Sequence, residues 1–262
     1  MKILRAKYSD DIKGYLSHYH DANELLYIVS GRISVNIGGE EREAGAGSLL
    51  VFSRFEEHSV RVLTSQYNRY TLLISPETAG TDDYLLSSVL INRTGEFDHI
   101  IDLGDGTNDI EILMREMAEE FKLRPPMYEK VLESMLTRLL VALYRLRPEL
   151  FLTNENRNTE IVREIQGKFE RDYSEHFSLA DLARGYHISV SHLSHSFKST
   201  TGYAPIEYLL SCRISAAKKL LSSTDKSIKE IVDLCGFSDE SNFSRTFREK
   251  VGMTPTEFRK FT

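Results

Sequence analysis

Two segments near the C-terminal end of the chain carry hydrogen-bonding side chains opposite a pair of apolar residues. Leu193 and Phe197, like Phe243 and Phe247, are spaced i, i+4, so each pair lies on the inner face of one helix. Asn and Arg can bond adenine and guanine edges bidentately, and Ser and His can donate to bases or phosphates. The outer faces therefore have the chemistry of DNA recognition, although a solvated helix face is the alternative for any single side chain. The candidate DNA-binding residues are Ser189, Ser191, His192, Ser194, His195 and Lys198 in the first segment, and Asp239, Glu240, Ser241, Asn242, Ser244, Arg245 and Arg248 in the second.

The two segments belong to a tandem repeat. At an offset of 50 residues the sequence of the second segment aligns with that of the first. The blocks that precede the two segments align with each other at an offset of 49. The one-residue difference falls in the connection between the blocks, where a turn can absorb it. Each copy predicts a short helix, a turn marked by Gly185 or Gly236, and a second helix. These are helix-turn-helix units over residues 178–199 and 227–250.

The repeat resembles the signature of AraC/XylS-type transcription regulators. The runs that carry the resemblance are RISAAKKLL at 213–221, IKEI at 228–231, CGFSDESNFSRTF at 235–247 and GMTP at 252–255. The resemblance extends from about Ile161 to Lys260 and implies an all-α DNA-binding domain over residues 159–262. It implies seven helices, with a long helix over about Ile206–Leu221 between the two units. In this family the second helix of each unit enters successive major grooves of double-stranded DNA, and an activator also contacts RNA polymerase.

The elements that precede this domain change from strands to helices. Residues 24–74 alternate short β-prone runs with turns that contain Gly, which favours a small barrel or double-sheet roll over residues 1–105. Across 106–151 the apolar period becomes helical, and Pro125-Pro126 divides this segment into a hairpin. We predict that part of its apolar stripes packs on the barrel and that the remainder forms a homodimer seam. The stripes contain Ile110, Leu113, Met117 and Phe121 on one helix, and Val131, Met135, Leu136, Leu139, Leu140 and Leu143 on the other.

A polar run over residues 152–158 predicts a linker, so the fold class is α+β with two domains. The order of barrel, hairpin and DNA-binding domain resembles family members that sense small molecules through a cupin-like domain. The spacing His18-x-His20-x3-Glu24-x6-Gly31 matches the first cupin motif. Gly47 and His58 fit the second motif, in which Ser53 and Phe55 replace the usual Pro and Gly.

The cupin resemblance implies a candidate ligand site in the barrel. In metal-binding cupins the matching positions hold one divalent ion, and here they are His18, His20, Glu24 and His58. Three imidazoles and a carboxylate suit Fe, Mn, Ni or Zn. The alternative, which we favour, is that these residues and Arg5 line an effector pocket that holds no cofactor.

Composition limits the remaining function classes. The net charge is −6, with 18 Lys and Arg against 25 Asp and Glu in residues 1–158 and 15 against 14 in residues 159–262. Charge alone therefore does not predict DNA binding, and the motifs carry that prediction. No apolar run is long enough to span a bilayer, no secretory signal is visible, and Cys212 and Cys235 make no disulfide framework. A cytoplasmic protein without a membrane partner is expected.

These observations predict a non-catalytic transcription regulator that responds to a small molecule. A sugar is the effector that the family resemblance suggests, bound in the barrel of a homodimer. One alternative is a metal-dependent cupin enzyme fused to a DNA-binding domain. A second alternative is a constitutive DNA-binding protein whose barrel is only structural.

Overall fold

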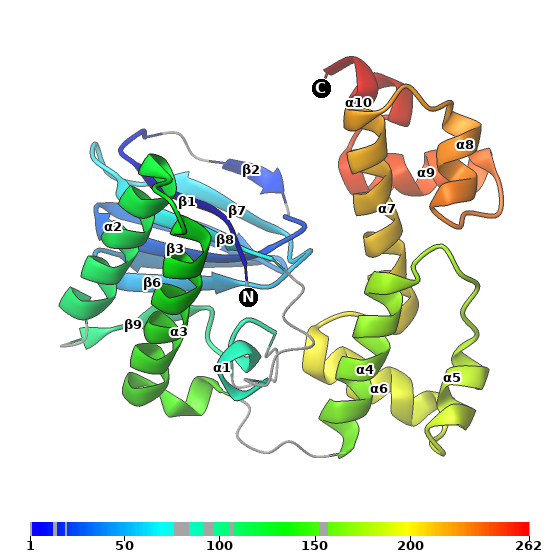
Figure 1. Ribbon diagram of the computed structural model, residues 1–262, viewed down its shortest axis with the longest axis horizontal. Coiled ribbons are helices and arrows are strands. Elements are labelled where there is room, and N and C mark those ends of the chain that lie inside the picture. The colour runs from blue at the N-terminus through cyan, green and yellow to red at the C-terminus, as the bar shows by residue number, and fades with distance from the viewer. Residues whose placement is uncertain are drawn as a thin grey trace. The chain divides into compact units, whose positions relative to one another are not determined.

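The computed structural model describes residues 2–12, 15–18, 20–75, 84–91, 97–104, 107–151 and 157–261. They fall into two units, Met1–Asn154 and Glu155–Thr262 (Figure 1). The first unit combines sheets and helices, and the described part of the second is helical. The predicted α+β class is confirmed.

The first unit contains two antiparallel sheets. Leu26, Ile28 and Phe52 from one sheet pack against Ile33 and Val35 from the other, forming a core between them. This is the predicted double-sheet arrangement. The five-stranded sheet has the order β1 (Ile3–Ser9), β8 (Asn68–Ile74), β3 (Asn23–Ser30), β6 (Ser48–Phe52) and β9 (Ile100–Asp102). The four-stranded sheet has the order β2 (Tyr15–His18), β7 (His58–Val62), β4 (Arg32–Ile37) and β5 (Glu40–Gly45).

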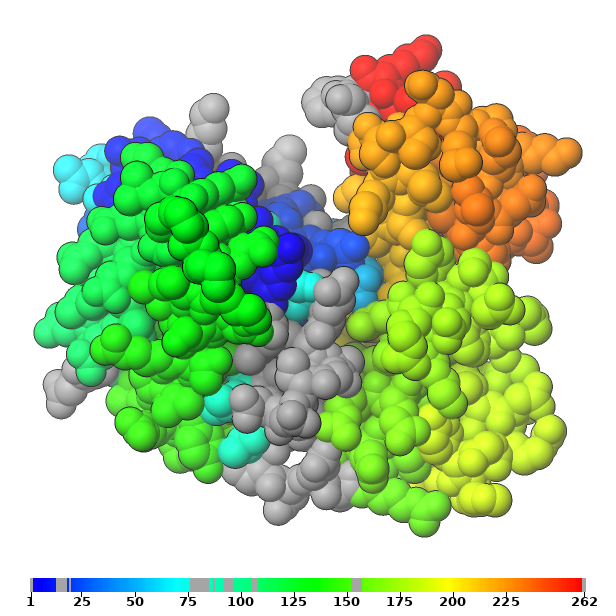
Figure 2. All heavy atoms as spheres, in the orientation of Figure 1, coloured from blue at the N-terminus to red at the C-terminus, as the bar shows by residue number. Residues whose placement is uncertain are grey.

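Helices cover the outer face of the five-stranded sheet. Because strand side chains alternate, Leu25 and Tyr27 of β3 face the helices while Leu26 and Ile28 face the other sheet. In the space-filling view, the green atoms of the hairpin helices cover most of the visible face of this unit (Figure 2). The helical segments are α1 (Tyr84–Ser88), α2 (Thr107–Leu123), α3 (Tyr128–Leu146) and the short η2 (Pro148–Leu150).

The hairpin uses most of its predicted apolar stripes within the chain. Most of the stripe residues are buried, because the two helices pack their apolar faces against the sheet and against each other. Of the stripe residues, only Val131 ranks among the exposed large hydrophobic residues, at 38% exposure. The other exposed apolar residues of this hairpin are Ile112, Leu123 and Met127.

The second unit contains seven described helices, as the family resemblance implied. Helix α7 contacts α4 and α6 on one side and α8, α9 and α10 on the other, so it bridges the two repeats. It is slightly longer than the predicted helix over Ile206–Leu221. The helices are α4 (Arg157–Arg171), α5 (Leu179–Gly185), α6 (Val190–Thr201), α7 (Pro205–Ser223), α8 (Ile228–Leu234), α9 (Glu240–Val251) and α10 (Pro255–Phe261).

The start of α4 corrects one sequence prediction. Residues 152–156 of the predicted linker lie outside the described residues, but Arg157 and Asn158 belong to α4. Its buried residues begin at Ile161, so the first helical turn is polar and was indistinguishable from a linker. None of the described helices combines the length and the apolar character that crossing a bilayer requires.

The turn inside each repeat requires a residue with positive φ. In the second helix-turn-helix repeat this residue is Gly236, at φ +72°, where an added Cβ would lie 2.3 Å from the carbonyl oxygen of Ser174. An offset of 49 places His187 at the equivalent position, and its φ is 58°. Gly185, the expected turn residue of the first helix-turn-helix repeat, is instead the last residue of α5. The repeat therefore keeps the backbone conformation of the turn without keeping the glycine.

We expect Gly236→Ala to lower the free energy of unfolding by about 2 kcal/mol or more. The left-handed conformation alone costs an L-residue roughly 1–2 kcal/mol, and the new Cβ would also displace the backbone at Ser174. Gly185→Ala is the matched control, because its Cβ meets nothing within 4 Å and alanine favours a helix. Urea unfolding of the full chain, followed by far-UV circular dichroism, measures both. Equal stability of the two variants would contradict the assignment of the turn.

Candidate functional site

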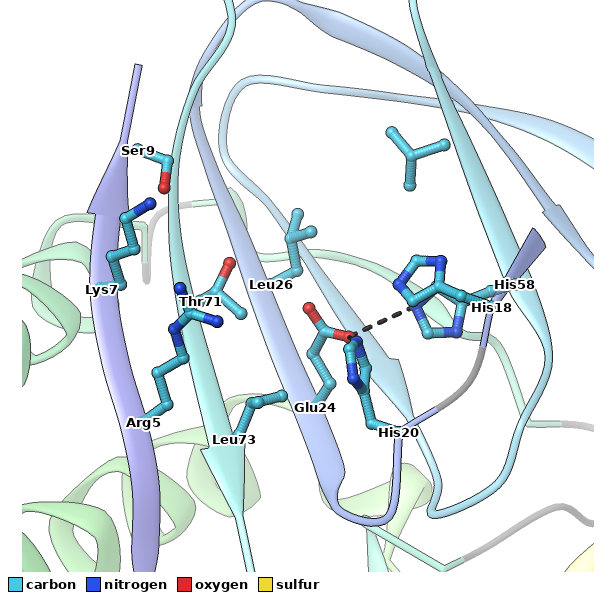
Figure 3. Close-up of a pocket in the computed structure, with 11 residues that line it drawn as sticks. Arg5, Lys7, Ser9, His18, His20, Glu24, Leu26, His58, Thr71 and Leu73 are labelled. Carbon is cyan, nitrogen blue, oxygen red and sulfur yellow. Dashed lines mark ion pairs between the residues drawn. The ribbon is translucent and has the colours of Figure 1, made fainter. Parts of the chain in front are cut away.

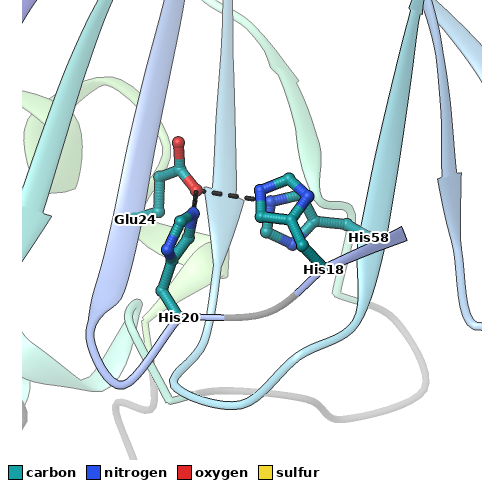
Figure 4. Close-up of side chains that lie close together, drawn as sticks. All are labelled: His18, His20, Glu24 and His58. Atoms are coloured by element: carbon teal, nitrogen blue, oxygen red, sulfur yellow. Dashed lines mark ion pairs between the residues drawn. The ribbon is translucent and has the colours of Figure 1, made fainter. Parts of the chain in front are cut away.

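Four titratable side chains converge at one end of the first unit. His18 ends β2, His20 follows in the connection to β3, Glu24 is the second residue of β3, and His58 begins β7. One ligand atom from each lies within 4.8 Å of the others (Figure 4). Glu24 Oε2 is 3.2 Å from Nε2 of His20 and 3.3 Å from Nε2 of His58. The structure thus brings together all four residues that the cupin resemblance selected.

The surroundings of His58 fix which of its nitrogens faces the cluster. Its Nδ1–H donates to the backbone carbonyl oxygen of Glu56 at 3.0 Å, because a carbonyl can only accept. The other ring nitrogen, Nε2, therefore faces Glu24. The ring also stacks on Phe52 with centroids 3.9 Å apart, so its orientation is held on two sides. This is the arrangement of a histidine prepared to bind a cation.

Glu24 is a buried carboxylate that the surrounding histidines stabilise. Burial by itself raises the pKa of the Glu24 carboxyl, but the adjacent imidazoles of His20 and His58 outweigh it and hold the pKa at about 2. Glu24 is therefore ionised at neutral pH. Its buried Oε2 makes no hydrogen bond of good geometry with the described residues, although both imidazoles are near. A buried anionic oxygen among imidazole nitrogens fits a divalent cation chemically.

A cavity of about 180 Å³ opens beside this cluster (Figure 3). All five residues predicted to bind a ligand, including Arg5, line this cavity. Figure 3 shows Arg5, Lys7 and Ser9 along β1 on one side of the cavity and the histidines on the other. Six further lining residues were not predicted from the sequence, and they are Lys7, Ser9, Leu26, Val60, Thr71 and Leu73. Given the pairing of β1 with β8, alternation from Arg5 brings Lys7 and Ser9 to the same cavity, but no pattern in the sequence alone marks them.

The two predicted recognition helices have the expected inner faces. Leu193 and Phe197 of α6, and Phe243 and Phe247 of α9, are fully buried. The opposite faces are accessible to solvent. The exposed candidates are Ser191, His192, His195 and Lys198 on α6, and Glu240, Ser241, Arg245 and Arg248 on α9, whereas Ser194, Asn242 and Ser244 are half-buried.

Two of the candidate DNA-binding residues also cap their helices. Ser189 accepts a hydrogen bond from the backbone N–H of His192, and Asp239 accepts one from that of Asn242. Asp239 is thereby held in its ionised form, because the backbone donor lowers its pKa. These side chains fix where α6 and α9 begin and which residues occupy their first exposed turn.

The central side chain of the α9 face is oriented before any partner binds. Asn242 Nδ2 donates to Ser238 Oγ at 3.4 Å, and Arg245 donates to Asn242 Oδ1 at 3.3 Å. The guanidinium of Arg245 is therefore placed beside the amide while it stays exposed. On α6, the Nε2 of His192 lies 3.1 Å from Oδ1 of Asn158, at the start of α4.

Comparison with known proteins identifies both halves of the chain. A helix-turn-helix domain family matches residues 182–260, and a cupin domain family matches residues 13–74. The HTH-type transcriptional activator RhaR of Mannheimia succiniciproducens is 23% identical over 245 residues, covering 92% of this chain and 86% of RhaR. The probable transcriptional regulator LumQ of Photobacterium leiognathi is 34% identical over 97 residues, which are 37% of this chain and 39% of LumQ. The chain thus matches about two fifths of LumQ but most of RhaR.

Among solved structures, ToxT from Vibrio cholerae O395, bound to (E)-4-(8-methylnaphthalen-1-yl)but-3-enoic acid, has a similar fold. The TM-score is 0.63 at 17% sequence identity, and the match covers 99% of each chain. At that identity the likeness supports the fold alone. Both domain families match this chain, the cupin domain before the helix-turn-helix domain, and the alignment with RhaR extends over 92% of the chain. The chain is therefore similar to transcription regulators of the AraC/XylS family, with a cupin domain at residues 13–74 and an AraC-type helix-turn-helix domain at residues 182–260.

Proposed function

We propose that the protein regulates transcription by binding double-stranded DNA through α6 and α9, under control of a small molecule bound in the cupin cavity. The observation that carries this proposal is the repetition of a capped helix with an exposed polar face, on the same chain as a charged cavity. The relatives RhaR and RhaS are named as transcriptional activators. Activation, with RNA polymerase as a further partner, is the corresponding proposal for this chain, and the barrel has no catalytic role in it.

The two recognition helices would contribute in different ways. The guanidinium fork of Arg245 can hold O6 and N7 of guanine together, and Asn242 restricts the directions in which that fork points. On α6, His195 can donate to a base, while the exposed Lys198 suits a phosphate. α9 would therefore supply most of the sequence preference, since the α6 face contains no arginine.

Strand β3 offers a route from the cavity to the helical hairpin. Glu24 and Leu26 line the cavity, whereas the side chain of Tyr27 passes through the other face of the sheet. Its hydroxyl donates to Glu111 Oε2 of α2 at 2.8 Å, and this bond together with burial raises the pKa of Tyr27. A ligand that moves β3 would thus shift a hydrogen bond to α2 and bias the hairpin between two arrangements.

The His18, His20, Glu24 and His58 cluster would hold a divalent ion if the cavity takes one. Such an ion would supply a fixed positive charge to which an oxygen of the effector can bind. The orientation of His58 by the Glu56 carbonyl, and the buried Glu24 oxygen that faces two imidazoles, support this proposal.

We also propose a homodimer that pairs through the exposed apolar residues of the hairpin. Leu123 and Met127 are 75% and 71% exposed at the turn between α2 and α3, and they are the most exposed large apolar residues among those described. Apolar side chains grouped at such a position are typical of an interface. Two DNA-binding domains held together would bind adjacent sites with higher avidity.

Arg245→Ala should weaken operator binding by about 1–3 kcal/mol and relax the preference at one or two base positions. His195→Ala should act about one helical turn, or ~10 base pairs, away. Lys198→Ala should lower the affinity for all DNA sequences alike and reduce the salt dependence of that affinity. Binding to a randomised operator library at two salt concentrations measures all three, with the barrel variant Arg61→Ala as the control. If Arg245→Ala and His195→Ala change the same base positions, the two-groove arrangement is wrong.

If the cluster binds a metal, about one divalent ion per chain should remain after purification without chelators, and His58→Ala should lose it. His195→Ala removes a histidine from the other domain and should leave the metal content unchanged. Elemental analysis by mass spectrometry gives the number of ions per chain. A wild-type protein that stays far below one ion per chain after addition of Fe, Mn, Ni or Zn would exclude the metal site, and the regulator proposal would stand.

For assembly, the double variant Leu123→Glu and Met127→Glu should convert a dimer into a monomer, because two charges cannot be buried unpaired in an apolar interface. Leu234→Glu, which alters an exposed leucine of α8, is the control and should leave the dimer intact. Sedimentation velocity of the full chain distinguishes the two states. A monomeric wild type, or a double variant that stays dimeric, would place the seam elsewhere.

A further inference from the structure

We propose that the effector is a small organic acid whose carboxylate binds Arg5 and Lys7 of β1. That the ligand acts as an effector rests on the proposed function, but the binding site itself follows from the cavity. Arg5 and Lys7 are two residues apart on one strand, so both side chains point into the cavity. Ser9 follows on the same face and adds a hydroxyl donor.

Among the described residues of the barrel, Arg5 and Lys7 lack the carboxylate partners that the other arginines have. Arg5 and Lys7 make no ion pair with any described carboxylate, and the one acidic residue in the cavity lining, Glu24, is already paired with His20 and His58. The other described arginines of the barrel are all paired. The pairs are Arg32 with Glu43, Arg42 with Asp98, Arg54 with Asp21, Arg61 with Glu41, and Arg69 with Asp11.

Register across the sheet places these cations opposite the histidine cluster. Strand β8 lies between β1 and β3, and neighbouring strands are about 4.8 Å apart, so Arg5 starts about 10 Å from Glu24. A ligand across β8 could thus have its carboxylate at β1 and a second polar group at the cluster. The two rows of facing residues are Arg5–Leu73–Glu24 and Lys7–Thr71–Leu26.

Size and polarity narrow the class of acid. The cavity of about 180 Å³ is close to the roughly 150 Å³ that admits benzene, so it suits one ring or a short chain. Leu26, Val60 and Leu73 supply an apolar surface for the carbon skeleton. A neutral sugar of the same size would leave two cations partly desolvated without a counter-charge, which is unfavourable.

The test is a thermal-shift titration of the full chain with small carboxylic acids, from acetate and malate to benzoate and its hydroxy derivatives. Each acid is compared with its neutral amide, and neutral pentoses and hexoses form a third group. We expect one or more acids to raise the melting temperature, and we expect the matching amides and the sugars to have no effect. Stabilisation by sugars or amides, or by none of the acids, would overturn the proposal.

Variants of β1 locate the binding site. Arg5→Gln and Lys7→Gln should each raise the apparent Kd of the stabilising acid about tenfold or more, since a charged hydrogen bond is lost. Arg5→Lys should retain part of the affinity. The matched control is Arg61→Gln, on β7 beside the cavity residues His58 and Val60 but absent from the cavity lining. Both β1 side chains are exposed, so the unliganded proteins should melt alike.

The same acid is then added to the operator-binding assay. A change in DNA affinity that Arg5→Gln abolishes would support both the acid and its role as effector. An acid that binds at Arg5 and Lys7 without changing DNA affinity would overturn the effector role. If a sugar controls DNA binding instead, the regulator function stands and the acid proposal fails.

Discussion

Strand β3 has no solvent-facing side, and the arrangement of the first unit depends on this. Its alternate side chains enter two different cores, with Leu25 and Tyr27 against the hairpin and Leu26 and Ile28 between the sheets. Because a shift by one residue would exchange the two sets, the register of β3 is strongly determined. That register also places Glu24 beside the histidines and leaves the Tyr27 hydroxyl on α2. The ligand site and the hairpin are thus opposite faces of one strand.

Burial of aromatic pairs has the same organising effect in the second unit. Phe243 and Phe247 pack together at 5.5 Å between ring centroids, and together with Leu193 and Phe197 they are fully buried. Once these faces are fixed, the intervening polar residues must point outward. The caps Ser189 and Asp239 then set the first turn of each recognition helix. The same packing therefore stabilises the domain and orients the side chains available to DNA.

Charge is distributed differently in the interior and at the mouth of the barrel. The deeply buried cation, Arg69, is paired with Asp11, and the buried anion, Glu24, is surrounded by imidazoles, because an uncompensated buried charge is very costly. Arg5 and Lys7 at the mouth are exposed to solvent, so water stabilises their charges without an ion pair to a described carboxylate. The cost of desolvating them arises only when the cavity is filled, and a ligand that carries negative charge offsets it.

The sequence by itself determined the helical repeat, the faces of α6 and α9, and the spacing of the cupin histidines. These depend on local periodicity, on capping residues and on motifs that lie within a few turns of chain. It could not reveal β1 as a wall of the cavity, because burial along this strand recurs at Ile3, Ala6 and Ser9 rather than at every second residue. A register irregularity between Ile3 and Arg5 turns Ile3 toward the helices and Arg5 toward the cavity. Pairing with β8, sixty or more residues away, decides that register, so only the tertiary structure placed Lys7, Ser9 and Thr71 in the site.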